Sequence, residues 1–140
     1  YRDIATNAPC GIHRTFLNRG GRKLDRKMLG RAKGAAIKLD DDVDVTLGLT
    51  IGEGIETTMS ARVAGLKPAW ALGSADAIAT FPVLPGIDCL TILGETDATG
   101  ANDRATATCG RQWLEAKREV RSVKPNDGGD INDALQKAKA

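Results

Sequence analysis

The chain has 140 residues, of which 41% are hydrophobic and 27% charged, and its formal net charge is +2. This is the composition of one ordinary globular domain, and no apolar run approaches the roughly 20 residues that a membrane helix needs. Cys10, Cys89 and Cys109 form no Cys-x-x-Cys pair and His13 is the single histidine, which excludes a zinc finger. We expect a reduced, cytoplasmic chain in which Cys89 and Cys109 pack as small hydrophobes. The polar start at Tyr1, with no Met, predicts a piece of a longer protein without a signal peptide.

Residues 1–44 are predicted to form a basic, β-rich segment. Alternating apolar and polar side chains indicate a strand over residues 10–17. A second strand, over Ala35–Leu39, is expected to pair with the first as an antiparallel hairpin. The remaining pieces are a turn at Asn18–Gly21, a Lys/Arg-rich stretch at Arg22–Gly34 that is either a loop or a short helix, and an acidic linker at residues 40–44 that marks a domain boundary.

From residue 45 to residue 140 strands and helices alternate, which predicts a second domain with a mostly parallel sheet and helices on its faces. Trp113 and Leu114 are expected to face the core. Ser74 is expected to cap the second helix. The predicted strands cover residues 47–51, 69–72, 89–93 and 119–123, and the predicted helices cover residues 55–64, 74–80, 102–117 and 131–138.

The charges are divided unevenly between these two parts. Residues 1–40 carry ten Lys/Arg against three Asp, whereas residues 41–140 carry ten Lys/Arg against fifteen Asp/Glu. A basic segment beside an acidic one fits a polyanionic substrate that one part holds and the other processes with a metal ion. The alternative is a solvated basic surface without a partner.

Three short acidic stretches are the most informative feature: Gly52-Glu53-Gly54, Glu95-Thr96-Asp97 and Gly129-Asp130-Ile131-Asn132-Asp133. The first two directly follow predicted strands, and ligands of such sheets bind beyond the carboxyl ends of the strands. Oxygen-rich clusters of this kind bind Mg²⁺ and process phosphodiesters. The glycines that flank the first stretch allow a sharp turn and close approach of a ligand.

Each stretch also has a second interpretation. Glu95 and Asp97, spaced i and i+2, would point the same way in an extended segment and repel each other without a cation, or they lie in a solvated loop. Glu56 either shares the pocket of Glu53 or complements the helix dipole. Asp130 and Asp133, with Asn132, either supply further oxygen ligands or cap the last helix.

Residues from about 46 to 138 resemble a Toprim domain, the catalytic fold shared by bacterial primases, topoisomerases, some nucleases and recombination mediators. The resemblance rests on three motifs, with Glu95 standing where the family's middle motif begins with aspartate: Thr50-Ile51-Gly52-Glu53-Gly54, Glu95-Thr96-Asp97 and Gly129-Asp130-Ile131-Asn132-Asp133-Ala134-Leu135. Four further stretches resemble phage- and plasmid-borne primases: Gly11–Leu17, Lys27–Gly30, Ile55–Ala64 and Pro68–Ser74.

The resemblance implies Mg²⁺- or Mn²⁺-dependent synthesis of RNA primers from nucleoside triphosphates on single-stranded DNA. Glu95, Asp97 and Asp130 would hold the metal, and Glu53 would be a further ligand or the general base. A replicative helicase, or further domains of the same polypeptide, would be a partner. The backbone of the nucleic acid would contact Arg14, Arg22, Lys23, Arg26, Lys27, Arg31 and Lys33. Few aromatic residues are present, so a stacking platform for single strands is not expected.

Other functions remain open at this point. A topoisomerase needs a tyrosine nucleophile, and the only tyrosine is Tyr1; a helicase half is excluded because no Gly-x-x-x-x-Gly-Lys-[Ser/Thr] loop occurs. A Toprim nuclease would use the same acids with water as the nucleophile. A non-catalytic nucleic-acid-binding module and a domain for a small phosphate ligand are the remaining alternatives.

Overall fold

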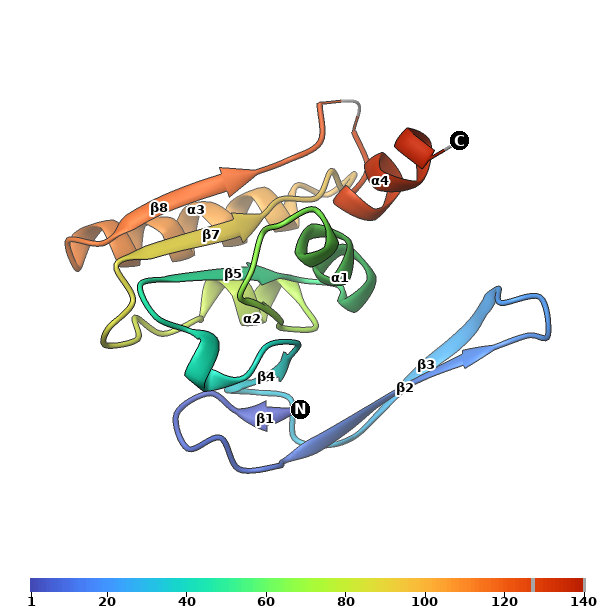
Figure 1. Ribbon diagram of the computed structural model, residues 1–140, viewed down its shortest axis with the longest axis horizontal. Helices are drawn as coiled ribbons and strands as arrows, with labels where there is room; N and C mark the ends of the chain where they lie inside the picture. Colours follow the sequence, from blue (N-terminus) through green and yellow to red (C-terminus); the bar gives the residue numbers. More distant parts are fainter. Residues whose placement is uncertain (127, 140) are drawn as a thin grey trace.

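The protein is built around a six-stranded sheet in the order β1-β4-β6-β5-β7-β8. Its structure, a computed structural model, describes residues 1–126 and 128–139, and Figure 1 shows β5, β7 and β8 side by side. Strands β5 to β8 run parallel, and β4 runs antiparallel to β6. The expectation of a mostly parallel α/β sheet is confirmed. The strands are β1 (Arg2–Asp3), β4 (Ala35–Lys38), β5 (Gly48–Gly52), β6 (Ala69–Ala71), β7 (Cys89–Leu93) and β8 (Glu119–Val123).

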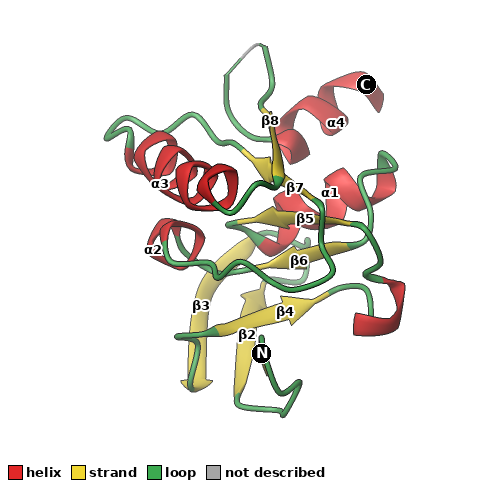
Figure 2. Ribbon diagram, turned by 90° about the vertical axis from the view of Figure 1, so that its left-hand side faces the viewer, coloured by secondary structure: helices red, strands yellow, loops and turns green. Residues whose placement is uncertain are grey.

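Helices cover both faces of the sheet, as Figure 2 shows: α2 and α3 pack together on one face, and α1 and α4 on the other. The helices are α1 (Ile55–Val63), α2 (Ala75–Ala79), α3 (Ala101–Glu115) and α4 (Ile131–Lys139), with a short 3₁₀ turn, η1, at Asp42–Asp44. The Ser74 hydroxyl accepts a hydrogen bond from the Ala77 amide at 3.2 Å, so the predicted cap of α2 is confirmed. No helix of the described ranges is long and apolar enough to cross a bilayer.

The core between the sheet and α3 is centred on Trp113, which is fully buried. Its ring stacks on Phe81 with the centroids 6.1 Å apart. Cys109, also buried, packs here as predicted, and burial raises the pKa of its thiol to about 12. Cys89 is only half-buried. The prediction for Leu114 was wrong: it is 58% exposed, because the next position of α3 already faces away from the sheet.

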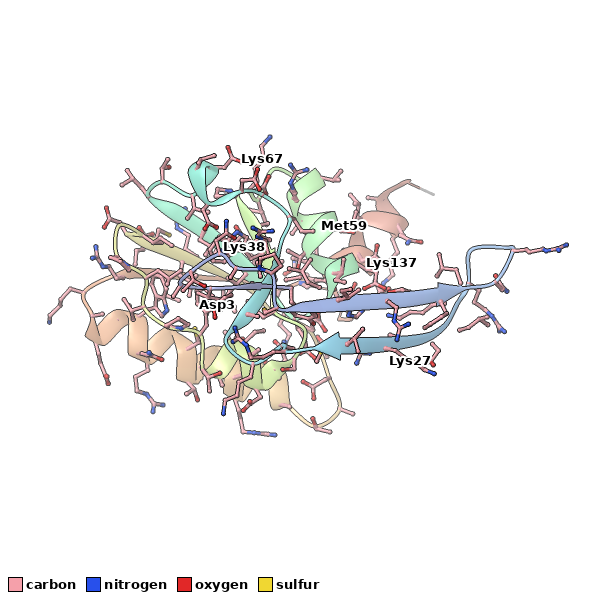
Figure 3. The ribbon with its side chains drawn as sticks, turned by 90° about the horizontal axis from the view of Figure 1, so that it is seen from below. Asp3, Lys27, Lys38, Met59, Lys67 and Lys137 are labelled. Atoms are coloured by element: carbon pink, nitrogen blue, oxygen red, sulfur yellow. The ribbon has the colours of Figure 1, made fainter. Side chains whose placement is uncertain are left out.

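A two-stranded antiparallel ribbon projects from this body (Figure 3). It consists of β2 (Gly11–Leu17) and β3 (Lys23–Gly30) with the turn between them, and is called the arm below. Two expectations were wrong here. Most of Arg22–Gly34 is neither loop nor helix but strand β3, and Ala35–Leu39 does not pair with β2. Strand β4 instead pairs with β1 and β6, because its buried alanines fill a place in the main sheet.

The expected linker at residues 40–44 begins with an anchored carboxylate. Asp40 is 9% exposed and accepts hydrogen bonds from the Ala69 amide at 2.9 Å and from Arg62 Nε at 2.8 Å. The Arg62 guanidinium lowers the pKa of this carboxyl. Asp40 therefore joins the end of α1 to the start of β6, beside β4. Strands β1 and β4 thus share a sheet with the second predicted domain, and the division at residue 44 stays a prediction.

We expect Asp40→Asn to lower the free energy of unfolding by about 2–3 kcal/mol at pH 7, because a charge-assisted pair with Arg62 is lost. The folded-state pKa of Asp40 is depressed, so its contribution is present above the unfolded pKa of about 3.9 and is lost as the pH falls through the folded value. Urea unfolding at pH 7 and at pH 3 measures both effects. Asp41→Asn, an exposed neighbour, is the control; an equal loss in both variants would contradict this role.

Candidate functional site

The three acidic stretches meet at one edge of the sheet, beyond the carboxyl ends of the parallel strands. Glu53 follows β5, and Glu95 lies two residues after β7. In Figure 1 the arrowheads of these strands point toward the start of α4, where the third stretch lies. The amide of Thr96 donates to the carbonyl of Gly129 at 3.0 Å, which joins the second stretch directly to the third.

Helix α1 also holds the third stretch in place. The hydroxyl of Thr57, one turn into α1, donates to Asp130 Oδ2 at 2.7 Å. One turn further on, Ser60 donates to Asn132 Oδ1 at 3.0 Å. Both hydroxyl-bearing side chains are buried. Segments more than 70 residues apart in sequence are thus bonded side chain to side chain.

Asn102, in the first turn of α3, links the first stretch to the second. It is 2% exposed. Its Nδ2 lies 3.4 Å from Glu53 Oε2, and its Oδ1 accepts a hydrogen bond from the Glu95 amide at 3.0 Å. Its own amide donates to Asp97 Oδ2 at 2.9 Å. One buried side chain and its backbone therefore contact all three acids of the first two stretches.

The sequence interpretation did not single out Asn102, although the pattern held a signal. Asn102, Ala105, Cys109 and Trp113 follow at helical spacing and form the buried stripe of α3. A polar residue in such a stripe must find hydrogen-bond partners. Here those partners are the acidic stretches.

Glu95 sits in the most acidic surroundings of the site. Burial raises the pKa of its carboxyl, and the nearby carboxylates of Glu53 and Asp130 raise it further, while the Thr57 hydroxyl and the Gly54 amide lower it in part. Its Oε1 is buried and has no hydrogen-bond partner among the described residues. A buried carboxylate oxygen without a donor is costly, and a cation beside it would remove that cost.

Asp97 turns toward the N-terminus of α3. Its Oδ1 accepts from the Thr99 amide at 2.8 Å and from the Ala101 amide at 3.1 Å. These bonds, together with those from the Thr99 hydroxyl and the Asn102 amide, hold the pKa of Asp97 far below its usual range. Glu95 and Asp97, although spaced i and i+2, have different surroundings: Asp97 bonds to amides at the start of α3, whereas Glu95 lies near the carboxylates of Glu53 and Asp130. Asp97 stays ionised at any ordinary pH.

Two secondary candidates have local partners. Asp133 and Asp130 form a reciprocal cap of α4, in which the Asp133 amide donates to Asp130 Oδ1 at 2.9 Å and the Asp130 amide to Asp133 Oδ2 at 3.3 Å. Asp130 keeps its Oδ2 on Thr57, toward the other acids. Glu56 is exposed and pairs with Lys23 of the arm at 3.0 Å.

The two glycines beside Glu53 have different surroundings. A Cβ on Gly52 would lie 2.5 Å from Thr58 Oγ1 and 3.0 Å from Leu93 Cδ1, so α1 packs directly against this backbone. A Cβ on Gly54 would lie 3.7 Å from Glu95 Oε1. That distance is an ordinary van der Waals contact, so the backbone at Gly54 lies close to this buried oxygen.

A cavity of about 440 Å³ is lined both by Glu53 and by residues of the arm. Gly54 and Glu56 line it beside Glu53. Four of the predicted nucleic-acid-binding residues line the same cavity: Lys23, Arg26, Lys27 and Lys33. The structure therefore brings cations and the first acidic stretch to one cavity, whereas Glu95, Asp97 and Asp130 are not among its lining residues.

The other three predicted cations lie elsewhere. Arg31 pairs with Asp3 at 2.6 Å and donates to the Lys33 carbonyl, so it fastens the base of the arm. Arg14 and Arg22 lie on the arm outside the cavity lining. Neither forms an ion pair with any residue that the structure describes.

The donor chemistry of this edge fits Mg²⁺. Glu53, Glu95, Asp97 and Asp130 offer carboxylate oxygens alone, the ligands that hard divalent cations prefer, and Glu95 Oε1 is without a partner. As the side chains lie, no three His, Cys, Asp or Glu of the described ranges are gathered as a ready metal site. The four carboxylates are nevertheless connected through Asn102, Thr57 and the bond between Thr96 and Gly129.

The fold and this edge define an α/β domain with an acidic site at the carboxyl ends of its parallel strands. Residues 48–140 match the family model described as the Toprim domain, which covers more than half of the chain. The chain therefore belongs to the Toprim domain family. Toprim domains generally bind Mg²⁺ through acidic residues and occur in nucleic-acid-processing enzymes such as primases, nucleases and topoisomerases. A comparison with curated proteins finds no match.

We expect Asn102→Ala to lower the free energy of unfolding by about 1–3 kcal/mol, because the buried Glu95 amide loses its acceptor. Urea unfolding at pH 7 measures this change. Asp103→Ala is the matched control, since its carboxylate makes only an exposed pair with Lys124 and its loss costs less than about 1 kcal/mol. Equal losses in the two variants would show that Asn102 does not support the acidic edge.

Proposed function

We propose that this chain is the Toprim catalytic core of a primase, which synthesises RNA primers on single-stranded DNA by Mg²⁺-dependent nucleotidyl transfer. The observation that supports this proposal best is the cavity that is lined by Glu53 together with Lys23, Arg26, Lys27 and Lys33. Nucleotidyl transfer brings together a polyanionic strand, a triphosphate and a metal site. The acidic residues can bind the metal ion, and the nearby cations can bind the strand and the triphosphate.

In this proposal Glu95, Asp97 and Asp130 hold one or two Mg²⁺ or Mn²⁺ ions, and Glu53 is a further ligand or the general base for the attacking 3′-hydroxyl. Bound Mg²⁺ supplies charge stabilisation for the transferring phosphoryl group. Asn102 fixes the position of Glu53 relative to the Glu95 backbone, because its side chain contacts both. Glu95, one methylene longer than aspartate, reaches the site from a half-buried position.

The cations of the cavity wall bind the phosphates of the incoming nucleotide and of the nucleic acid. Lys23, Arg26, Lys27 and Lys33 line the cavity, whereas Arg14, Arg22 and Arg31 extend the basic surface along the arm and its base. Contacts of this kind give affinity that falls steeply with salt and depends little on sequence. We further propose a cytoplasmic protein that acts with a replicative helicase or with additional domains of its own polypeptide.

The test is to incubate the chain with single-stranded DNA, the four ribonucleoside triphosphates and Mg²⁺, and to separate the products on a denaturing gel. New short RNA is the expected result. Shortened DNA would replace the proposal by a Toprim nuclease, in which the same acids activate water. DNA that is retained but unchanged would indicate a non-catalytic binding module. A reaction without Mg²⁺ shows whether any product depends on the metal.

A further inference from the structure

The arm has an outer face that borders the cavity only through Lys27. In an antiparallel ribbon, residues directly opposite each other share a face and neighbours along a strand alternate. His13 lies opposite Met28, and both line the cavity. The neighbouring pairs on the other face are Ile12 with Leu29, Arg14 with Lys27 and Phe16 with Asp25.

This outer face is open to solvent and belongs to a strongly basic segment. Every residue of β3 is exposed, and Ile12 and Leu29 are 57% and 59% exposed. Residues 11–33 contain eight Lys/Arg and one Asp. A two-stranded ribbon without a further layer is marginally stable by itself, so an arm of this composition gains stability when a polyanion covers it.

Two cations stand directly opposite each other on this face. Arg14 is the cross-strand partner of Lys27, and like charges in this arrangement destabilise a ribbon. Asp25, at 3.9 Å from Lys27, offsets part of the repulsion, and Arg14 has no ion-pair partner among the described residues. Lys27, whose long side chain also borders the cavity, is seen beside the arm in Figure 3. A phosphate near both cations would remove the remaining repulsion.

Phe16 lies between these cations and is 42% exposed. The Arg14 guanidinium carbon is 5.9 Å from the centroid of its ring, and the Lys27 ammonium nitrogen is 6.0 Å from it. An exposed aromatic ring flanked by cations is the combination that binds single strands, by stacking on a base and pairing with the adjacent phosphates. The sequence, with its few aromatics, gave no reason to expect stacking; the exposure of Phe16 changes that expectation.

We propose that the outer face of the arm binds single-stranded DNA, with one unpaired base stacked on Phe16 and the neighbouring phosphates on Arg14 and Lys27. Duplex DNA does not offer an unpaired base, so the face selects single strands. The choice of DNA rests on the proposed function, in which the template is a DNA strand. Lys23, Arg26 and Lys33 of the cavity stay available for the nucleotide.

The experiment measures binding of a fluorescein-labelled oligothymidylate of about 12 nucleotides to the full chain by anisotropy, in EDTA. Phe16→Ala should weaken binding roughly 5- to 100-fold, and Phe16→Trp should restore it. Leu17→Ala, which truncates a still more exposed apolar residue of the arm (57% against 42% for Phe16), should stay within about twofold. Arg14→Gln should reduce the slope of log affinity against log salt by about 0.7.

Phe16→Trp also gives a direct signal of stacking. The two natural tryptophans are buried, with Trp70 3% and Trp113 0% exposed, so the introduced indole is the one that DNA can reach. Its fluorescence should be quenched by the oligonucleotide. Unchanged affinity of Phe16→Ala, or no quenching of Phe16→Trp, would overturn the proposal.

Other occupants of the face give different outcomes. Equal or tighter binding of oligouridylate or of duplex DNA would overturn the assignment to single-stranded DNA. A chain that is dimeric without DNA and monomeric as Phe16→Ala would assign the face to a second copy and overturn it too. Because binding is measured without Mg²⁺, these results are independent of primer synthesis. If Phe16 stacks on DNA but the chain makes no primers, only the proposed function is wrong. If the chain makes primers but Phe16 does not stack, only this inference is wrong.

Discussion

Glu53→Gln is expected to reduce Mg²⁺-dependent primer synthesis at least about 100-fold while the fold stays intact. The amide keeps the shape of the side chain, and its oxygen can still accept from Asn102 Nδ2. It loses the negative charge that would hold the metal or accept the proton of the 3′-hydroxyl. Initial rates of primer formation at saturating template measure the effect, and circular dichroism with urea unfolding checks the fold.

The matched control for this variant is Asp103→Asn. Asp103 lies beside Asn102 in α3, but its carboxylate pairs with Lys124 at 2.8 Å and does not contact the acidic stretches. Its neutralisation should leave the rate within about twofold. If Glu53→Gln retained the parent rate, the acidic edge would not be the catalytic site. Equal losses in both variants would indicate a general electrostatic effect.

The largest expected effect on stability is that of Trp113→Ala, which should lower the free energy of unfolding by about 3–5 kcal/mol. Trp113 is fully buried and stacks on Phe81, so its truncation leaves a cavity under the sheet. Urea unfolding followed by far-ultraviolet circular dichroism measures the loss. Trp113→Phe keeps an aromatic ring and removes an indole N–H that has no partner among the described residues, so its cost should be clearly smaller.

Leu114→Ala provides the second control for the core. Leu114 follows Trp113 directly but is 58% exposed, so its truncation should change the free energy of unfolding by less than about 0.5 kcal/mol. A loss comparable to that of Trp113→Ala would mean that α3 is rotated relative to the sheet. Asn102, on the same stripe as Trp113, would then not face the acidic stretches.

The sequence predicted those elements that bury an apolar face. Strands β7 and β8 have the predicted bounds, and α3 differs by one residue at its start and two at its end. Strand β3 was missed because neither of its faces is buried: all of its residues are exposed, so no alternation of apolar and polar residues marks it. Strand β4 was assigned to the wrong partner. It pairs with β6, which lies more than 30 residues further along the chain, and with the two-residue strand β1.

The sequence predicted which acidic residues form the site, but not the hydrogen bonds that hold them in place. Motif spacing at strand ends brought Glu53 and Glu95 to one edge, which follows from the parallel sheet alone. The orientation of Asp97 depends on the amides of Thr99 and Ala101, and the position of Asp130 depends on the Thr57 hydroxyl. Such contacts join distant segments, and local sequence patterns carry little information about them.

We propose that the acidic stretches form one Mg²⁺ site. The decisive experiment is calorimetric titration of the intact chain with Mg²⁺ in the presence of a ribonucleoside triphosphate, corrected for metal binding to the nucleotide alone. We expect saturable binding that disappears in Asp97→Asn and persists in Asp103→Asn. Absence of any protein-dependent heat in the intact chain, or undiminished binding in Asp97→Asn, would contradict it.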